Sequence, residues 1–340
     1  MPEIIILFQA LFLYLINFNQ TNMLLPELSD IMQAHKRIRP FIHTTPVMTS
    51  KQLNNIFGGE LFFKCENFQK TGSFKFRGAT NAVLQLNDKE KKQGVITHSS
   101  GNHAAALALA ASTFGIKSFA VMPANAADVK KNAVKEYGAE IVLCEPTQKA
   151  REQTTSEIIE KNGTILIHPY NNFNVICGQG TASVEFLEQI PDLDIIITPV
   201  GGGGLLSGTA TAVKGLKPDI KVYGAEPKNA NDAFKSFTTG TLHPSLSPNT
   251  LADGLLTSLS ELTFTIIRKY VDWIYTVSEK SIVECMRLIW ERMKIIIEPS
   301  SAVTLAVIKE NPDLIIGKKS GLILSGGNVE LDRLPFNRPF

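Results

Sequence analysis

The chain contains few cysteines and tryptophans, and neither charge is in large excess. Its 340 residues include two tryptophans, and 34 Lys plus Arg against 32 Asp plus Glu leave a net charge of +2. A near-neutral chain without a basic cluster gives no reason to expect nucleic acid or an anionic membrane as a partner. The four cysteines, Cys65, Cys144, Cys177 and Cys285, form no C-x-x-C pair. Neither a disulfide framework nor a zinc site is predicted, and a reducing cytoplasm is the simplest compartment.

Long apolar runs are also missing, apart from one near the N-terminus. Ile4 to Phe18 is nearly all apolar, but about fifteen residues are short of the roughly twenty that a membrane helix needs. Glu3 stands where a signal peptide carries positive charge, and no small-residue cleavage site follows. We predict that residues 1–22 lie outside the fold, with an anchor or a signal as the alternative. The 44% hydrophobic content is enough for a large core in one domain or two.

Short apolar runs alternate with longer helical patterns along the rest of the chain. This rhythm is typical of an α/β protein with parallel strands. The predicted strands are Leu61–Lys64, Gly94–Thr97, Ser118–Met122, Glu140–Cys144, Asp194–Val200, Lys221–Ala225 and Gly321–Ser325. Helices are predicted at residues 104–114 and 128–137, the second ending at Gly138, where glycine suits a left-handed cap. Ligands of such folds collect at the carboxyl ends of strands, so the loops that follow strands are where a site is expected.

Three of these loops have unusual sequences. The first, Gly201–Gly204, joins the predicted strand at 194–200 to a helical pattern at 205–213. Its bare backbone N–H groups and the helix start suit a phosphate. The spacing matches neither the dinucleotide fingerprint nor a P-loop, so a dinucleotide or a nucleoside triphosphate is not its obvious ligand. A tight turn without a ligand is the alternative.

The second and third loops bring hydroxyl, amide and amine groups. The segment His98–His103 could bind a carboxylate at a helix start, or simply cap that helix. The segment Lys70–Gly78 contains Lys75 between two aromatic residues, with Lys70 and Arg77 nearby. A lysine in an apolar and cationic setting has a lowered pKa and can form a Schiff base, whereas a lysine taken alone is more often a solvated surface residue.

Taken together and in order, these loops resemble the signatures of one enzyme family. The segments Ser73–Ala79, Ser99–His103, Gly201–Gly204 and Ser325–Asn328 are similar to motifs of fold-type II pyridoxal-phosphate (PLP) enzymes, of the serine racemase and serine/threonine dehydratase family. The resemblance runs from about Leu28 to Leu331, close to the whole chain. It implies the tryptophan synthase β-like α/β fold, in which two open twisted parallel-type sheets have flanking helices.

The resemblance assigns several side chains to PLP. It implies that Lys75 carries the cofactor with Phe74 beside it, that Gly201, Gly202, Gly203 and Gly204 hold the phosphate, that Asn102 meets the ring hydroxyl and that Ser325 faces the pyridine nitrogen. A hydroxyl partner, unlike a carboxylate, does not keep that nitrogen protonated, so the ring withdraws electrons less strongly. Loss of a β-leaving group or brief removal of the Cα proton fits these electronics.

The same resemblance implies the residues that meet the substrate. Lys75 would be the base on one face of Cα, and Ser100 the second acid/base that racemisation needs on the other face. Dehydratases similar to threonine deaminases usually carry alanine at that position, and a helix cap is the alternative role for Ser100. The remaining substrate residues would be Ser99, Asn102 and His103 at the carboxylate, Arg151 on closure of a small domain, and Thr257, where serine is frequent. No serine run follows His168-Pro169, which favours serine over aspartate.

Two further sites are implied. Glu226, Ala230 and Asp232 resemble a divalent-cation site of two carboxylates and a backbone carbonyl, suited to Mg²⁺, Ca²⁺ or Mn²⁺. The alternative is that Asn231 or Asp232 simply caps the next helix. Related racemases bind a nucleotide between subunits, at positions that match Ser50, Lys51, Gln52, Lys70, Thr71 and Lys294. Lys51 and Gln52 depart from the usual small and aliphatic residues, so activation by ATP is expected on the resemblance alone.

The sequence therefore predicts a cytoplasmic PLP enzyme, expected as a homodimer, that acts on a small amino acid. The predicted large domain comprises residues 23–93 and 171–340, and a small mobile domain, residues 94–170, is inserted between these parts. The predicted reaction is interconversion of L- and D-serine, with elimination of serine to pyruvate and ammonia. Two alternatives stay open: an L-serine/L-threonine dehydratase without racemase activity, and a PLP-binding protein without turnover.

Overall fold

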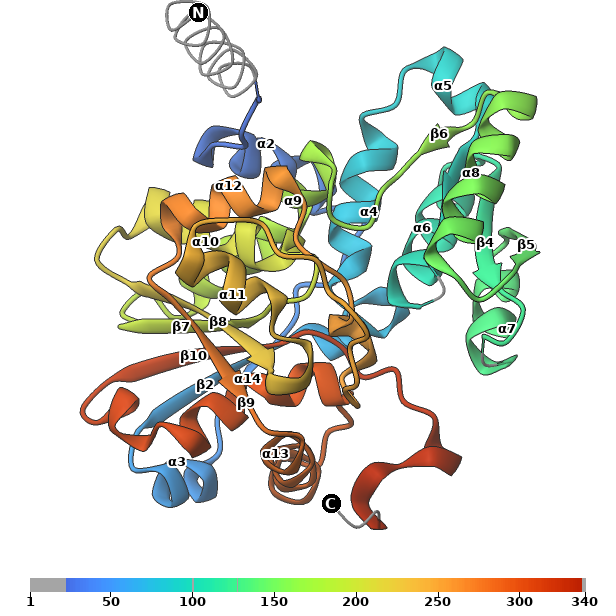
Figure 1. Ribbon diagram of the computed structural model, residues 1–340. Helices are drawn as coiled ribbons and strands as arrows, with labels where there is room; N and C mark the ends of the chain where they lie inside the picture. Colours follow the sequence, from blue (N-terminus) through green and yellow to red (C-terminus); the bar gives the residue numbers. More distant parts are fainter. Residues whose placement is uncertain (1–22, 100, 127, 338–340) are drawn as a thin grey trace, which may run out of the picture.

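The strands form two sheets. The computed structural model describes residues 23–99, 101–126 and 128–337. A six-stranded sheet has the order β1-β2-β10-β7-β8-β9, and a four-stranded sheet has the order β5-β4-β3-β6. Their strands are β1 (Val47–Met48), β2 (Glu60–Cys65), β3 (Val95–Thr97), β4 (Ser118–Pro123), β5 (Glu140–Cys144), β6 (Ile165–Leu166), β7 (Ile195–Pro199), β8 (Lys221–Pro227), β9 (Trp273–Val277) and β10 (Lys319–Leu324). Figure 1 shows the two sheets in separate lobes, with the four-stranded one on the right.

Helices connect most of the strands. They are α2 (Leu28–Ile38), α3 (Lys51–Phe57), α4 (Lys75–Leu84), α5 (Asp88–Gln93), α6 (Asn102–Thr113), α7 (Asp128–Glu136), α8 (Gln148–Asn162), α9 (Phe173–Gln189), α10 (Gly204–Leu216), α11 (Asp232–Thr239), α12 (Glu261–Tyr270), α13 (Glu279–Met293) and α14 (Pro299–Glu310). Short 3₁₀ turns add η1 (Glu66–Phe68), η2 (Lys70–Gly72), η3 (Lys228–Ala230), η4 (Asp253–Leu255), η5 (Pro312–Ile315), η6 (Leu331–Arg333) and η7 (Pro335–Asn337).

Every described strand pair is parallel except β1 with β2. Parallel strands need crossover connections, and the helices that form them cover the sheet faces. The central strands are consequently apolar throughout: all five residues of β7 are buried. The seven predicted strands are all present, with bounds shifted by at most one or two residues, and the predicted α/β class is confirmed. The predicted glycine cap is also found, with φ 97 at Gly138.

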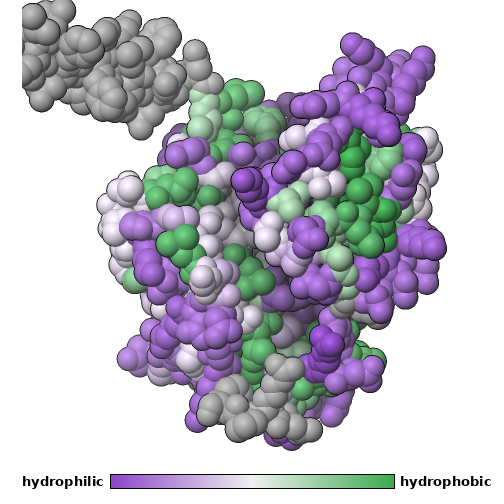
Figure 2. All heavy atoms as spheres, turned by 45° about the vertical axis from the view of Figure 1, so that its right-hand side comes forward, coloured by the Kyte–Doolittle hydropathy of each residue, from purple (hydrophilic) through white to green (hydrophobic). Residues whose placement is uncertain are grey.

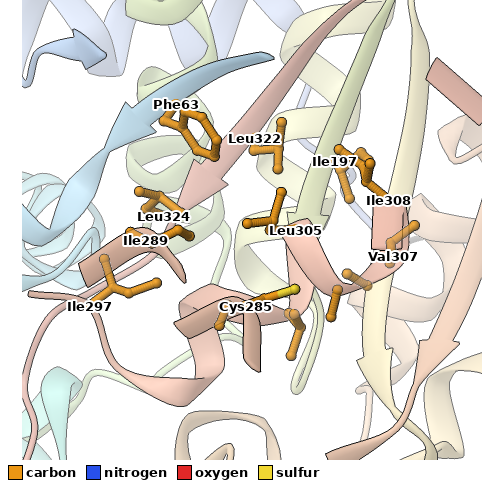
Figure 3. Close-up of a cluster of buried hydrophobic side chains, with 14 of the residues drawn as sticks. Phe63, Ile197, Cys285, Ile289, Ile297, Leu305, Val307, Ile308, Leu322 and Leu324 are labelled. Atoms are coloured by element: carbon orange, nitrogen blue, oxygen red, sulfur yellow. The ribbon is translucent and has the colours of Figure 1, made fainter. Parts of the chain in front are cut away.

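The larger core lies between the six-stranded sheet and helices α13 and α14. Leu322 of β10 and Ile197 of β7 pack there against Leu305 of α14 and Ile289 of α13, all with no exposed surface (Figure 3). Burying one such side chain contributes about 1.5–3 kcal/mol. This packing holds the carboxyl ends of β7 and β10 in place, and those ends lead to the glycine loop and to Ser325.

The four-stranded sheet is built from residues 95–166, with α6 and α7 packed on one face and α8 on the other. The chain enters this lobe between α5 and β3 and leaves it between β6 and α9. Helix α4 packs against both α6 and α9, so the helix that begins at Lys75 lies where the lobes meet. Its contact with α9 is close, because a Cβ on Gly178 would lie 2.6 Å from the Arg77 carbonyl oxygen. The division into domains at residues 94 and 170 stays a prediction.

Hydrophilic residues cover much of the face in Figure 2, with smaller hydrophobic areas between them. In the part of the chain that the structure describes, no helix combines the length and the apolar character that crossing a bilayer requires. The apolar segment that we predicted to lie outside the fold, residues 1–22, falls outside the described residues.

Candidate active site

One cavity of ≈ 870 Å³ lies between the two lobes, and most of the predicted site residues line it. The predicted residues that line the cavity are Phe74, Lys75, Ser99, Asn102, His103, Arg151, Gly201, Gly202, Gly203, Gly204, Thr257 and Ser325. These residues come from loops and helix starts that follow the carboxyl ends of parallel strands, or from α8, as expected for this class of fold. Segments more than 200 residues apart in the chain thus meet around one space.

Lys75 is the first residue of α4, and its amine faces the cavity. Its Nζ donates to the carbonyl oxygen of Pro169 at 3.1 Å and lies 5.0 Å from the Phe74 ring centroid. Burial lowers the pKa of Lys75 to about 8, and the neighbouring Glu298 opposes that shift. Because a larger fraction of the amine is neutral near pH 7 to 8 than for an ordinary lysine, Lys75 can act there as a nucleophile or as a base.

The glycine loop is a cradle into which no side chain fits. Gly203 has φ +85 and caps α10, a left-handed conformation that favours glycine. A Cβ on Gly202 would lie 2.2 Å from the Tyr170 ring, and one on Gly201 would lie 2.9 Å from the backbone of Leu255. The loop therefore leaves backbone N–H groups and the start of α10 open to the cavity, which suits a phosphate.

The start of α6 supplies a second set of donors. Asn102 and His103 are its first two residues, whose backbone N–H groups have no partner within the helix. His103 Nε2 donates to the Ile167 carbonyl at 3.0 Å, and burial holds the pKa of this ring well below its usual value. The neutral ring has an unprotonated Nδ1, so its backbone N–H is the group that can donate to a carboxylate. Ser100, the predicted second acid/base, lies outside the described residues.

Asn102 is held by its neighbours. Its Nδ2 lies 3.0 and 3.1 Å from the two carboxylate oxygens of Glu298, and its Oδ1 accepts from Asn328 Nδ2 at 2.9 Å. Ser325, by contrast, is buried at the end of β10 with its hydroxyl 3.1 Å from that of Ser301. The side-chain partner of Ser325 is therefore another hydroxyl. The ring contacts predicted for Asn102 and Ser325 stay predictions.

Several cavity residues escaped the sequence analysis. Glu298 is one of them: burial raises the pKa of its carboxyl, and Asp253 adds to that rise. Lys130 of α7 reaches across the cavity mouth and lies 2.5 Å from Asp253 of η4. Tyr170 packs on the glycine loop and lines the cavity together with Thr257. A basic or acidic residue between apolar segments is usually a solvated one, and only the fold shows that these face a shared space.

The predicted cation site is a pair of buried carboxyls beside α11. Glu226 accepts the backbone N–H groups of Ala233 and Phe234, at 2.9 and 2.8 Å. Asp232 Oδ2 is buried with no hydrogen-bond partner among the described residues. Burial raises the pKa of Asp232 to about 6 and that of Glu226 well above its usual value. A divalent cation would give the two carboxylates a positive counter-charge and would give Asp232 Oδ2 a partner. These residues therefore fit a metal ion. No group of three or more His, Cys, Asp or Glu suited to a metal occurs in the described ranges.

The six predicted nucleotide residues lie in three elements away from the cavity lining. Ser50 caps α3, followed by Lys51 and Gln52; Lys70 and Thr71 belong to η2; and Lys294 ends α13. Thr71 and Lys294 both have φ 60, a conformation that non-glycine residues adopt at a cost of about 1–3 kcal/mol and that concentrates at functional sites. Their strain fits a binding role, and the nucleotide site stays a prediction.

Two sheets that enclose a cavity, with a lysine amine of low pKa facing a glycine cradle, define an α/β enzyme suited to a phosphorylated aldehyde cofactor. Residues 38–326 match the model of the family described as pyridoxal-phosphate dependent enzyme, and the chain belongs to that family. The predicted fold-type II architecture and the PLP cofactor are thereby confirmed.

Two relatives and one solved structure show how close the similarity is. The chain is 52% identical to a serine racemase of Dictyostelium discoideum, over 90% of this chain and 96% of the relative. It is 48% identical to a beta-hydroxyaspartate dehydratase of Paracoccus denitrificans, over 93% and 100%. The structure of maize serine racemase is 43% identical, with a TM-score of 0.89 over 91% of this chain and 95% of that one.

Proposed function

We propose that this chain interconverts L- and D-serine with PLP and also eliminates water from serine to give pyruvate and ammonia. The observation that carries the proposal is the Lys75 amine, which faces the glycine loop and the start of α6 across one cavity. The names of the relatives support it, since serine racemases and a dehydratase are similar to nearly the whole chain. When bound, PLP supplies an electron-withdrawing ring that makes the substrate Cα–H acidic.

The side chains divide the chemistry between them. Lys75, with its lowered pKa, takes the proton from one face of Cα and can return it there. Ser100 is proposed to deliver a proton to the other face, which inverts the configuration. The backbone N–H groups at the start of α6, together with Ser99, hold the carboxylate. The same deprotonated substrate can instead expel its β-hydroxyl. One deprotonated substrate therefore leads either to D-serine or to pyruvate and ammonia.

The polarity of the walls favours short-lived carbanion character. Ser325, at the end of β10, and Ser301 of α14 carry neutral hydroxyls 3.1 Å apart, so these two side chains would offer the ring nitrogen of bound PLP no charged partner. Arg151 lines the cavity from α8, and its Nε is buried without a partner in the described part of the chain. We propose that Arg151 turns toward the bound substrate when the lobe of residues 94–170 closes, which also excludes water.

Metal binding at Glu226, the Ala230 carbonyl and Asp232 is proposed to stabilise the loop that lines one side of the cavity. Burial raises the pKa of Asp232 and Ser245, a cavity-lining residue, opposes that shift, so the carboxyl pair lies next to that wall. We expect Mg²⁺ to raise the thermal midpoint of the protein and Ca²⁺ or Mn²⁺ to replace it. Asp232→Asn should cancel the increase, and an equal increase in that variant would contradict the site.

The assembly, the activator and the location form a further part of the proposal. A homodimer and activation by ATP are proposed on the family resemblance, with the left-handed Thr71 and Lys294 as structural support for the nucleotide. A cytoplasmic location agrees with four cysteines that are all unpaired. Sedimentation with and without ATP tests whether the protein is a homodimer and whether ATP acts on the assembly.

A dehydratase without racemase activity is the second candidate. The similarity to a beta-hydroxyaspartate dehydratase favours it, at 48% identity over the whole of that relative. Incubation of the purified protein with L-serine, PLP, Mg²⁺ and ATP separates the candidates, with D-serine followed by chiral chromatography and pyruvate measured in the same sample. Both products support the proposal, pyruvate alone makes the chain a dehydratase, and neither product from the PLP-loaded protein would refute both.

A further inference from the structure

The segment that joins β6 to α9 contains a histidine that bonds its own backbone. We propose that His168 is a positioning residue, whose Nδ1 holds the turn at residues 169–171 so that the Pro169 carbonyl faces Lys75 and the Tyr170 ring faces the glycine loop. The inference rests on the proposed function, because Lys75 and the glycine loop are the parts of the site that the turn serves.

Two hydrogen bonds define the turn. His168 Nδ1 accepts the backbone N–H of Asn171 at 2.9 Å and that of Tyr170 at 3.3 Å. A side-chain acceptor that bonds N–H groups two and three residues ahead does what an Asn or Asp does in an Asx turn. Pro169 favours the same geometry, because it holds the residue before it in an extended conformation and has no N–H of its own.

The turn places two groups at the site, the Pro169 carbonyl and the Tyr170 ring. The carbonyl of Pro169 accepts from Lys75 Nζ at 3.1 Å, which gives the amine a fixed direction. The ring of Tyr170 lies so close to Gly202 that a Cβ there would be 2.2 Å away. If the turn relaxed, both the amine and the wall over the glycine loop would lose their partner.

His168 acts through these neighbours rather than on a ligand. Among the described residues that line the cavity are Pro169 and Tyr170 but not His168. Its ring lies between two others, with centroids 5.1 Å from His98 and 4.6 Å from Tyr170 in edge-to-face contact. These contacts fix the plane of the imidazole and hence the direction of Nδ1.

The acceptor role requires an unprotonated Nδ1. Burial, with His98 and Lys75 nearby, lowers the pKa of His168 to about 3. The ring is therefore neutral across the range in which an enzyme of this kind works, and it carries its proton on Nε2 because Nδ1 faces two N–H donors. This separates His168 from a general acid or base, which needs a pKa near the working pH.

The test compares two replacements that differ in the acceptor. In His168→Asn the amide oxygen can take the place of Nδ1, whereas His168→Leu removes the acceptor and keeps a side chain of moderate size. His243→Leu is the matched control, since His243 lies outside the cavity lining. The readouts are the dissociation constant of PLP for the cofactor-free protein, the pH at which Lys75 is half modified by an acylating reagent, and kcat and KM with L-serine.

We expect His168→Leu to weaken PLP binding about tenfold and to lower kcat about 10- to 100-fold, because a misplaced amine loses near-attack geometry. Lys75 should become reactive at lower pH, because its ammonium form loses the Pro169 carbonyl as an acceptor. His168→Asn should stay within about threefold of the parent protein in each measurement. Equal behaviour of the two variants, or unchanged PLP affinity and Lys75 reactivity in His168→Leu, would overturn the proposal.

Failure of the proposed function can be told apart from failure of this inference. PLP affinity and Lys75 modification are measured without substrate, so they report on the turn even if the parent protein neither racemises nor dehydrates serine. Far-ultraviolet circular dichroism of the cofactor-free variants checks the fold. If His168→Leu is unfolded, His168→Gln supplies the comparison, since its amide carries an acceptor placed one bond further out. Its PLP affinity should then be lower than that of His168→Asn, and equal affinities of the two variants would overturn the proposal.

Discussion

Replacing Arg77 with methionine should destabilise the protein strongly, although Arg77 does not line the cavity. The guanidinium is fully buried and makes two bonds of 2.7 Å to the carboxylate of Glu66. It also lies 3.1 Å from Glu185, which has Lys64 as a second cation at 2.5 Å. These four charges balance, so removal of one leaves a buried carboxylate without its counter-charge. Among the described residues, Glu66 would keep only the hydroxyl of Thr45 as a hydrogen-bond partner.

Breaking a buried pair from one side costs about 3–5 kcal/mol, because the partner left behind is desolvated and uncompensated. The assay is equilibrium urea unfolding of the cofactor-free protein, which removes the stabilisation that a bound ligand adds. Arg333→Met is the matched control: Arg333 is 74% exposed and pairs with Glu330 at 3.5 Å, so its loss should cost less than about 1 kcal/mol. The double variant with Glu66→Gln should regain part of the loss. A cost below about 1 kcal/mol for Arg77→Met, equal to the control, would refute the reasoning.

Three further outcomes are expected. Ser100→Ala should lower D-serine formation at least about 100-fold while pyruvate formation persists, measured by chiral chromatography, and parallel losses of both products would contradict its role. Lys75 in the cofactor-free protein should be half modified by an acylating reagent near pH 8, since its pKa is lowered to about 8; Glu298→Gln should shift this point lower, and a value near that of free lysine, about 10.4, would contradict the burial. Lys130→Met should raise KM for serine about three- to fivefold with little change in kcat, because the partly exposed pair with Asp253 is worth about 1 kcal/mol. Lys131→Met, which affects a pair within α7, is the control.

Most of the strands that the sequence predicts are buried, with the edge strand β5 as an exception. Runs such as residues 195–199 are apolar on both faces because helices cover both sides of a parallel sheet. The three strands that the sequence analysis missed are edges of the sheets or short. β1 and β6 have two residues each, so their length does not distinguish them from loops. β9 is longer, but it lies at the edge of its sheet with an exposed Trp273, and its burial does not alternate.

The site divides in the same way. Loops with a local signal, such as the four glycines or the serines before Asn102, were identified because their composition alone is unusual. Lys130, Glu298 and Tyr170 were not given roles, since each depends on partners far along the chain, as when Lys130 meets Asp253. The burial and the partners of such residues depend on how the two lobes pack. The linear sequence alone does not show which distant residues come together.

The unpaired cysteines have a practical consequence. All four are buried, and burial raises the pKa of Cys65, Cys177 and Cys285 to about 12. Because the thiolate is the form that reacts, a native molecule is nearly inert to alkylating reagents, and each thiol becomes reactive only when its surroundings open. Cys144 belongs to β5 of the four-stranded sheet, whereas Cys65 and Cys285 lie in the core beside the six-stranded sheet. Alkylation followed peptide by peptide would therefore time the opening of each lobe separately, with the natural sequence as its own probe.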